Sequence, residues 1–158
     1  MESDGPGIRA ARSDEAEILS HICFRAKSYW EYPRELMNHW LESSTLSITP
    51  EEIEANPTYV AYDGEGELLG FYSLGLQDEE SSIRNLCVLP ELVGAGVRTM
   101  LFLHACEMAE ESGASFLTVV SDLLESHFYK EMGAAPVGEK IDRTPAGDRL
   151  MTIFRMNL

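Results

Sequence analysis

Residues 88–97 read VLPELVGAGV, and this stretch decides how the rest of the chain is arranged. It follows a β-rich run, carries Gly94 and Gly96, and continues directly into an apolar helical pattern. The first amides of a helix have no internal partner and carry partial positive charge, and glycines let a phosphate approach that backbone closely. A strand, a glycine loop and a buried helix together predict a phosphate-binding corner. Taken alone, two glycines before a helix also fit an ordinary tight turn.

Several familiar site types are absent from the sequence. Thr99 stands where a dinucleotide-binding GxGxxG loop has its third glycine, and no Gly-Lys-Ser/Thr follows. No Gly-x-Ser-x-Gly elbow occurs, which argues against a serine hydrolase. No metal site is predicted, because none of the histidines has ligand spacing such as HExxH. These histidines are His21, His39, His104 and His127.

The element types alternate along the chain, which predicts a mixed α/β domain. Helical spacing or helix start signals mark some segments, and β-rich runs bounded by turn residues mark others. The predicted helices cover residues 13–28, 33–41, 49–55, 97–112 and 121–132. The predicted strands cover residues 7–11, 58–62, 67–74, 82–89, 116–120, 135–141 and 149–158.

Capping residues predict where three of these helices begin. Ser13 is expected to cap the first helix, with acidic residues placed well for the helix dipole. Thr49 precedes a proline at the first helical position and a glutamate at the third. Ser121 and Asp122 are expected to cap the last helix, and Gly133 is expected to end it.

The length and composition fit one globular domain. The chain has 158 residues, of which 44% are apolar. We expect residues 1–6 to be a flexible N-terminus and residues 7–158 to form a single domain. The first residues lack the basic start and apolar run of a secretory signal, and no stretch approaches the roughly 20 apolar residues of a membrane span. A cytoplasmic location is therefore expected.

The charge is strongly negative, with a net value of −15 and a sequence pI of about 4.5. Such a surface repels nucleic acid and anionic membranes, so neither is expected as a partner. It tolerates or attracts a cationic amine, although solubility is the simpler explanation. The three cysteines, Cys23, Cys87 and Cys106, are far apart and form no CxxC pair, which argues against a disulfide framework and a zinc site. They are expected as small buried hydrophobes.

Three segments resemble one known family. Residues 88–97 resemble the acetyl-CoA motif of the GNAT superfamily of N-acetyltransferases, in which a strand ending in V-x-P leads to Gln/Arg-x-x-Gly-x-Gly/Ala. Residues 128–134, FYKEMGA, resemble the family segment that ends in F-Y-x-x-x-G-F/A. Residues 27–32, KSYWEY, resemble a stretch found in one branch of the family. The order of predicted elements is also that of the family, so the resemblance covers nearly the whole chain.

The resemblance implies a GNAT fold, which is a mixed, strongly twisted sheet of six or seven strands flanked by helices. It implies acetyl-CoA as the acyl donor, no metal, and direct transfer of the acetyl group to a primary amine without a covalent enzyme intermediate. Tyr129 would protonate the leaving CoA thiolate, and Trp30 and Tyr32 would line the acceptor pocket. The implied CoA-binding residues are Leu86, Cys87, Val88, Val93, Gly94, Ala95, Gly96, Val97, Arg98 and Thr99.

The sequence departs from the family pattern at several positions. Val93 replaces the preferred Gln or Arg, and Arg98 replaces a Gly or Ala, where it would either pair with a phosphate or crowd the loop. Leu124 and Glu125 stand where relatives often carry Asn and Ala. Arg84 occupies a strand position where relatives often have an acidic general base. Glu31 is the one substitute base that the sequence suggests, acting through water.

These departures keep a second hypothesis open: a non-catalytic acyl-CoA-binding or regulatory module on the same fold. A third is transfer of an acyl group other than acetyl. The acceptor is not predicted more closely than a small-molecule or peptide amine, which includes polyamines, antibiotics, amino acids and protein amino groups. A homodimer is consistent with many relatives, although no residue pattern marks an interface.

Overall fold

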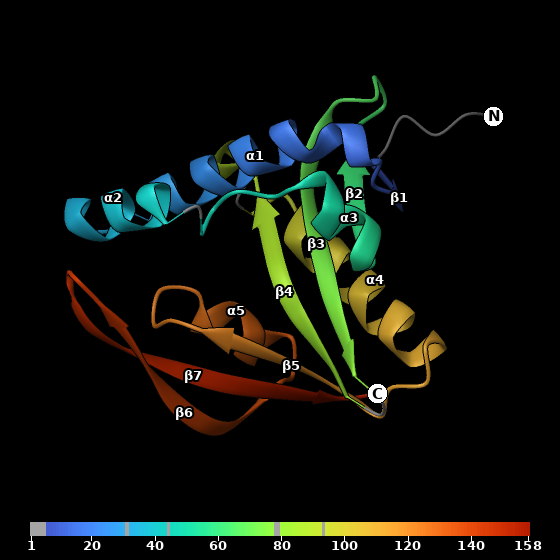
Figure 1. Cartoon of the computed structure of the whole chain (residues 1–158). Coiled ribbons are helices and arrows are strands. Elements are labelled where there is room, and N and C mark those ends of the chain that lie inside the picture. The colour runs from blue at the N-terminus through green and yellow to red at the C-terminus, as the bar shows by residue number, and fades with distance from the viewer. Residues whose placement is uncertain (1–5, 31, 44, 78–79, 93) are drawn as a thin grey trace.

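The computed structural model describes residues 6–30, 32–43, 45–77, 80–92 and 94–158. Within this part of the chain, seven strands form one sheet in the order β1-β2-β3-β4-β5-β7-β6, and helices pack on it (Figure 1). The strands are β1 Gly7–Ala10, β2 Thr58–Tyr62, β3 Leu68–Gln77, β4 Glu80–Val88, β5 Phe116–Ser121, β6 Ala135–Thr144 and β7 Gly147–Asn157. The helices are α1 Ala16–Tyr29, α2 Arg34–Glu42, α3 Pro50–Ala55, α4 Val97–Glu111 and α5 Ser126–Glu131. The predicted mixed α/β fold is confirmed.

The sheet opens between β4 and β5. The two strands pair in parallel only where Glu80–Ser82 lie beside Phe116–Thr118. Beyond that point β4 continues along β3 as far as Val88, whereas β5 continues along β7 as far as Ser121. Figure 1 shows the two strands diverging, with α5 beside β5. One edge of β4 is therefore left without a neighbouring strand over its second half.

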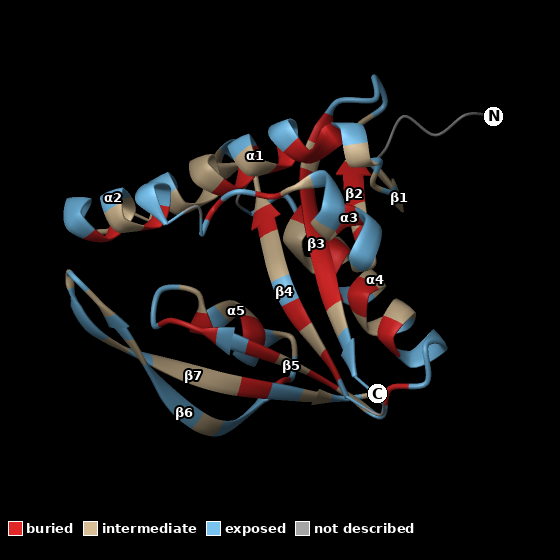
Figure 2. Cartoon of the chain, in the orientation of Figure 1, coloured by how far each residue is buried: buried red, intermediate tan, exposed pale blue. Residues whose placement is uncertain are grey.

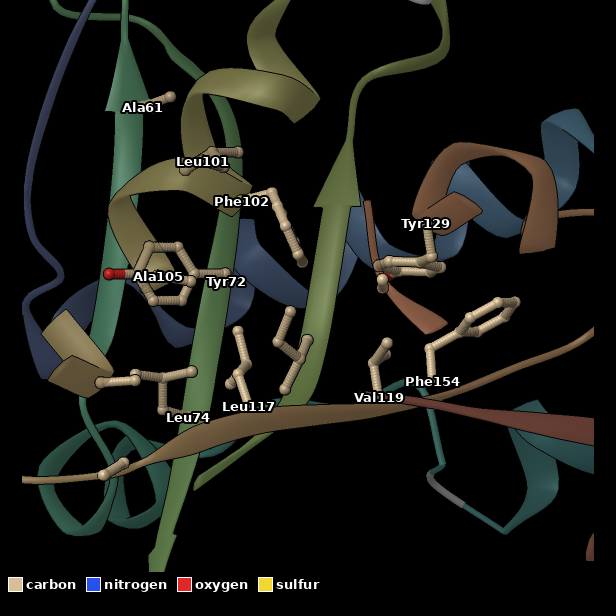
Figure 3. Close-up of a cluster of buried hydrophobic side chains, with 14 of the residues drawn as sticks. Ala61, Tyr72, Leu74, Leu101, Phe102, Ala105, Leu117, Val119, Tyr129 and Phe154 are labelled. Atoms are coloured by element: carbon tan, nitrogen blue, oxygen red, sulfur yellow. The ribbon is translucent and has the colours of Figure 1, made fainter. Parts of the chain in front are cut away.

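Apolar side chains form a core on each face of the sheet. On one face, α4 packs Leu101 and Phe102 against Tyr72 of β3 and Leu117 of β5, and Figure 3 shows this cluster reaching Phe154 of β7. On the other face, α1, α2 and α3 cover β2 and β3, and their buried residues include Leu19, Ile22, Trp40, Ile53, Val60 and Phe71. Figure 2 shows the result, since β3 is almost wholly buried and β6, at the edge, is largely exposed.

The starts of two helices differ from the prediction. Ser13 does not cap α1, because residues 13–15 form a short 3-10 turn and α1 begins at Ala16. The Glu15 carboxylate holds this turn by accepting the Arg12 amide at 2.8 Å and the Arg9 guanidinium at 2.7 Å. Thr49 caps α3 as predicted, through a hydrogen bond from the Glu52 amide.

The last helix is shorter than predicted and begins at Ser126. Asp122 Oδ1 accepts the amides of Leu124 at 3.0 Å and Glu125 at 3.1 Å, which closes a local turn instead of a helical one. Such side-chain bonds to nearby amides compete with helix formation. The turn places Asp122 and Glu125 at the open edge of the sheet. None of the described helices is long and apolar enough to cross a bilayer.

Candidate active site

The N-terminus of α4 is built to receive an anion. Gly94 and Gly96 have φ values of 89° and 84°, a backbone conformation that residues with a Cβ atom seldom adopt. Gly96 is the N-cap of α4, and no side chain caps the helix. The first turn also carries no acidic residue. Within the described residues, the amides of this turn therefore have no side-chain partner, and they lie at the positive end of a 15-residue helix.

A cavity of about 230 Å³, which we call the loop pocket, opens beside this helix end. Gly94, Gly96 and Thr99 form its floor at the loop, and Leu86 and Val88 border it from β4. Its remaining lining residues are Ala26, Tyr29, Trp30, Pro90, Leu92, Arg98, Glu125 and Phe128. The loop pocket therefore joins the helix N-terminus to the unpaired edge of β4.

Arg98 supplies a positive charge to the loop pocket without blocking it. Its guanidinium lies 4.5 Å from the centre of the Phe128 ring and 5.8 Å from that of Trp30. Stacking on these rings draws the side chain towards the wall formed by α5 and the end of α1. Arg98 therefore lines the loop pocket while its guanidinium lies over the Phe128 ring.

A second cavity of about 290 Å³, which we call the cleft pocket, lies where β4 and β5 diverge. Residues 83–87 of β4 and residues 119–120 of β5 form its two sides, and Tyr129 borders it from α5. Its remaining lining residues are Cys23, Lys27, Trp40, Thr45, Leu46, Glu125, Asp142 and Arg149. The loop pocket and the cleft pocket share two lining residues, Leu86 and Glu125.

Tyr129 is held rigidly beside the cleft pocket. It is buried, with its ring packed against Phe102, Phe128 and Phe154, and Figure 3 shows it directly beside Phe154. Burial and the nearby Glu125 carboxylate raise the pKa of the Tyr129 phenol above its ordinary value. The phenol therefore keeps its proton at neutral pH and can donate it.

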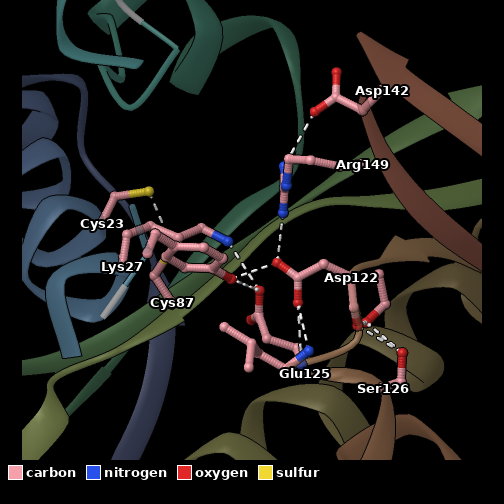
Figure 4. Close-up of polar contacts among 11 residues, drawn as sticks. Cys23, Lys27, Cys87, Asp122, Glu125, Ser126, Asp142 and Arg149 are labelled. Carbon is pink, nitrogen blue, oxygen red and sulfur yellow. Dashed lines mark hydrogen bonds and ion pairs between the residues drawn. The ribbon is translucent and has the colours of Figure 1, made fainter. Parts of the chain in front are cut away.

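A network of charged side chains crosses the cleft and joins four elements (Figure 4). Lys27 Nζ of α1 donates to Glu125 Oε2 at 2.8 Å, and Arg149 of β7 donates to Asp122 Oδ2 at 2.7 Å. The second arm of Arg149 binds Asp142 at 3.0 Å. The Tyr32 hydroxyl donates to Asp122 and lies 3.4 Å from Glu125 Oε2. Burial alone would lower the pKa of Lys27, but the Glu125 carboxylate outweighs it and the pKa lies above its ordinary value.

Cys23 and Cys87 meet under the cleft, with 3.1 Å between their sulfur atoms, and both are buried free thiols. The hydrogen bond to Cys23 and burial raise the pKa of the Cys87 thiol. A protonated, buried thiol is a poor nucleophile. Cys106 is only half-buried and packs against the margin of the core.

The structure brings most of the predicted site residues together. Leu86, Val88, Gly94, Gly96, Arg98 and Thr99 line the loop pocket, and Trp30 lies there with them. Cys87 and Tyr129 line the cleft pocket. Val97 is buried in the core beneath α4, and Ala95 lines neither pocket. Tyr32 also lines neither, because its hydroxyl is engaged by the charged network. Val93 and Glu31 lie outside the described residues.

Sequence reasoning did not single out Lys27, Asp122 or Arg149 as members of a charged network. Lys27 and Glu125 are 98 positions apart, and Arg149 is 27 positions from Asp122. Two sequence signals pointed to this corner, which are the departure from the family pattern at Glu125 and the predicted acceptor-pocket residue Tyr32. His104 is satisfied within the fold, since its Nδ1 lies 2.6 Å from the Tyr72 hydroxyl. Among the described residues no group of three or more His, Cys, Asp or Glu is placed to hold a metal ion.

A strand that leads through a glycine loop into the uncapped N-terminus of a buried helix is the arrangement that residues 88–97 predicted. A model of the Acetyltransferase (GNAT) family matches residues 17–134, which is most of the chain. The chain belongs to the GNAT acetyltransferase family.

Known GNAT proteins match over nearly their whole length. The chain is 25% identical over 134 residues to a Bacillus subtilis (strain 168) protein named "Putative [ribosomal protein bS18]-alanine N-acetyltransferase", covering 82% of each. A GCN5-related N-acetyltransferase structure from Rhodopseudomonas palustris superposes with a TM-score of 0.82 at 21% identity, covering 100% of this chain and 99% of that one. The PaiA N-acetyltransferase of Thermoplasma acidophilum, solved in complex with coenzyme A, superposes with a TM-score of 0.74 at 16% sequence identity. The match covers 98% of this chain and 99% of that one. These structures establish the GNAT fold for the chain.

Proposed function

We propose that the protein is an acetyl-CoA-dependent N-acetyltransferase that moves the acetyl group directly to a primary amine. The observation that carries the proposal is the uncapped N-terminus of α4 at Gly96, which opens into a cavity bordered by the unpaired edge of β4. Family membership supports the reaction class. The two pockets meet at Leu86 and Glu125, which is where a donor and an acceptor would react.

In this proposal the pyrophosphate of CoA binds the amides from Gly94 to Arg98. The amides at the start of α4 carry the positive end of the helix dipole, and no side chain of the described residues competes for them, whereas the Ala95 amide already donates to the Leu92 carbonyl. The Arg98 guanidinium adds a full positive charge nearby. The acyl-pantetheine arm then lies along Leu86, Cys87 and Val88, whose strand lacks a neighbour on that side. An extended arm that hydrogen-bonds this edge takes the place of a strand.

The chemistry that we propose is direct attack of a neutral amine on the thioester carbonyl. The carbon–sulfur bond breaks, and the departing thiolate takes the proton of Tyr129. A phenol with a raised pKa retains that proton until negative charge develops on sulfur. Cys87 is no alternative nucleophile, because its thiol is buried and its pKa is raised. Positioning of the two reactants supplies the rest of the rate.

The acceptor that we would test first is the α-amine of a protein or peptide, because the name of the B. subtilis relative specifies an alanine amine. Small-molecule amines remain in the same proposal, and so does a cytoplasmic location. The net charge of −15 favours a cationic acceptor over an anionic one at long range.

The binding half of the proposal is tested by isothermal titration with acetyl-CoA and with CoA. Micromolar affinity, or about −8 kcal/mol, is expected if the α4 N-terminus holds the pyrophosphate. No detectable binding at millimolar ligand would contradict the acetyltransferase proposal. Binding without turnover of any amine would favour the non-catalytic acyl-CoA-binding module instead.

The catalytic half is tested with Tyr129→Phe, which keeps the buried ring and removes only the hydroxyl. We expect turnover at neutral pH to fall by about 10²–10⁴-fold, since that is the usual contribution of a general acid. The affinity for CoA should stay the same, because the backbone loop is unchanged. Unaltered turnover would show that Tyr129 is structural.

A further inference from the structure

Glu125 occupies the junction of the two pockets. It is the N-cap residue of α5, and its side chain is 17% exposed. It and Leu86 are the residues that line both the loop pocket and the cleft pocket. Leu86 has no group that can accept a proton. Among the described residues, Glu125 is thus the titratable side chain that lines both the loop pocket, which is the proposed donor site, and the cleft pocket.

One oxygen of the Glu125 carboxylate is fixed and the other is available. Lys27 Nζ at 2.8 Å and the Tyr32 hydroxyl at 3.4 Å both bind Oε2. Oε1 accepts no hydrogen bond from the part of the chain that the structure describes. No fully buried side-chain oxygen or nitrogen there lacks a partner, so Oε1 is not sealed away from the cavity. The Lys27 contact therefore holds the side chain in one orientation and leaves Oε1 able to bind a ligand.

The neighbouring carboxylates are already engaged. Asp122 accepts hydrogen bonds from Tyr32, from Arg149 and from the backbone amides of Leu124 and Glu125, so both of its oxygens are occupied. Asp142 binds the other arm of Arg149. Asp142 Oδ1 and Glu125 Oε1 both lack a hydrogen bond within the described residues, but Asp142 lines only the cleft pocket, whereas Glu125 lines both pockets.

We propose that Glu125 binds the ammonium group of the acceptor through Oε1 and takes the proton that must leave before the amine can attack. This step rests on the proposed function. The ammonium loses one proton to the carboxylate, which becomes a carboxylic acid, and the neutral nitrogen forms the bond to the thioester carbonyl carbon. The carbon–sulfur bond then breaks, and the thiolate takes the Tyr129 proton. The amide nitrogen returns a proton to Tyr129, and Glu125 releases its own to water.

The position of Glu125 suits this sequence of events. Tyr129 follows it by four residues on the same helix, so the two side chains project from neighbouring turns. The coupling between them is visible in the pKa of Tyr129, which the Glu125 carboxylate helps to raise. The proposed proton acceptor and proton donor thus border the same cleft.

Charged and titratable groups from every packed element surround Glu125. Those in contact or close by are Lys27 and Cys23 from α1, Tyr32 from the following connection, Cys87 from β4, Asp122 from the preceding turn, Tyr129 from α5 and Arg149 from β7. Arg98 from α4, Arg84 from β4 and Asp142 from β6 also line the pockets that Glu125 borders. A pH profile of the enzyme reports the combined titration of these interacting groups and not that of Glu125 alone. The test therefore compares the pH profiles of variants.

The experiment uses the full chain, acetyl-CoA and L-alaninamide as the probe amine, with release of the CoA thiol as the readout. For Glu125→Gln we expect kcat/KM at pH 7 to fall by about 10²–10⁴-fold. The loss should shrink as the pH rises towards the pKa of the amine, because the neutral amine then forms without a base. The Kd for CoA should be unchanged. Glu131→Gln, on the same helix but exposed and paired with His127, is the matched control and should behave as the unaltered protein.

A purely structural role predicts a different pattern. If Glu125 only anchors Lys27, then Lys27→Met and Glu125→Gln should lose activity equally and by a constant factor at every pH, and that result would overturn the proposal. Glu125→Asp, which keeps a carboxylate on a shorter stem, should retain part of the activity and covers the case in which the glutamine variant fails to fold. An unaltered protein that binds CoA but acetylates no amine would instead refute the proposed function itself.

Discussion

At the scale of single residues, burial decides which charged contacts contribute to the stability of the fold. Glu15 is 8% exposed and is held by the Arg9 guanidinium and the Arg12 amide. The Arg9 hydrogen bond is the main cause that lowers the pKa of this carboxyl from its ordinary 4.5. By contrast, Asp14 next to it is exposed and pairs only with the exposed Arg12. Exposed pairs of this kind contribute little to stability.

We therefore expect Glu15→Gln to lower the free energy of unfolding at pH 7 by about 1.5–3 kcal/mol, the range for hydrogen bonds to charged groups. A carboxyl whose pKa is lowered by folding stabilises the protein above its unfolded pKa, and this contribution is lost as the pH falls through the folded pKa. The difference between the two proteins should accordingly shrink below pH 4.5, as urea unfolding would measure. Asp14→Asn serves as the control. A difference that stays constant on acidification would contradict this account.

At the scale of elements, the glycine loop before α4 combines a backbone requirement with a binding role. Gly96 has a φ of 84°, and a Cβ atom built there would meet nothing within 4 Å. Gly66, in the turn between β2 and β3, has the same φ and the same open space. The two positions thus share one conformational cost, while only Gly96 adjoins the proposed CoA site.

Gly96→Ala and Gly66→Ala should each cost about 1–2 kcal/mol of stability, because a left-handed conformation is unfavourable for alanine. Only Gly96→Ala is expected to weaken CoA binding as well, since the first amides of α4 would shift. Thermal unfolding and calorimetric titration of both variants measure the two effects. Equal CoA affinity in the two variants would show that the α4 N-terminus does not hold the ligand.

The same elements show what the sequence could and could not predict. The loop at 94–96 and the helix after it were recognisable because their signal is local: glycines, then apolar residues at helical spacing. Asp122 was recognised as a cap, but its hydrogen bonds to Leu124 and Glu125 delay the helix to Ser126, which local patterns do not reveal. The role of Glu125 depends on Lys27, 98 positions away, and only the folded chain brings the two together.

At the scale of the whole molecule, like charges predominate. The chain has 27 acidic residues against 12 basic ones, and the described ion pairs engage several of the basic ones inside the fold. The remaining acidic surface repels itself, and this repulsion lowers the stability of the compact state. Salt screens the repulsion between exposed charges more strongly than it screens the attraction within buried ion pairs.

We expect the melting temperature to rise as NaCl is increased from low ionic strength to 0.5 M. In a chain of this length each kcal/mol of relieved repulsion is worth about 2–4 °C. KCl at the same ionic strength should act equally, because screening does not depend on the identity of the cation. A melting temperature that falls in both salts would mean that attractive ion pairs dominate instead.

Because β4 and β5 diverge, β4 has an unpaired edge in the middle of the sheet. Exposed strand edges normally invite pairing with other chains, and proteins protect them. Here the edge cannot be closed without losing the cleft, and α5 and the charged side chains flank the opening. A ligand lying there would complete the hydrogen bonding of the sheet, which makes the empty protein, in architectural terms, a sheet that lacks one strand.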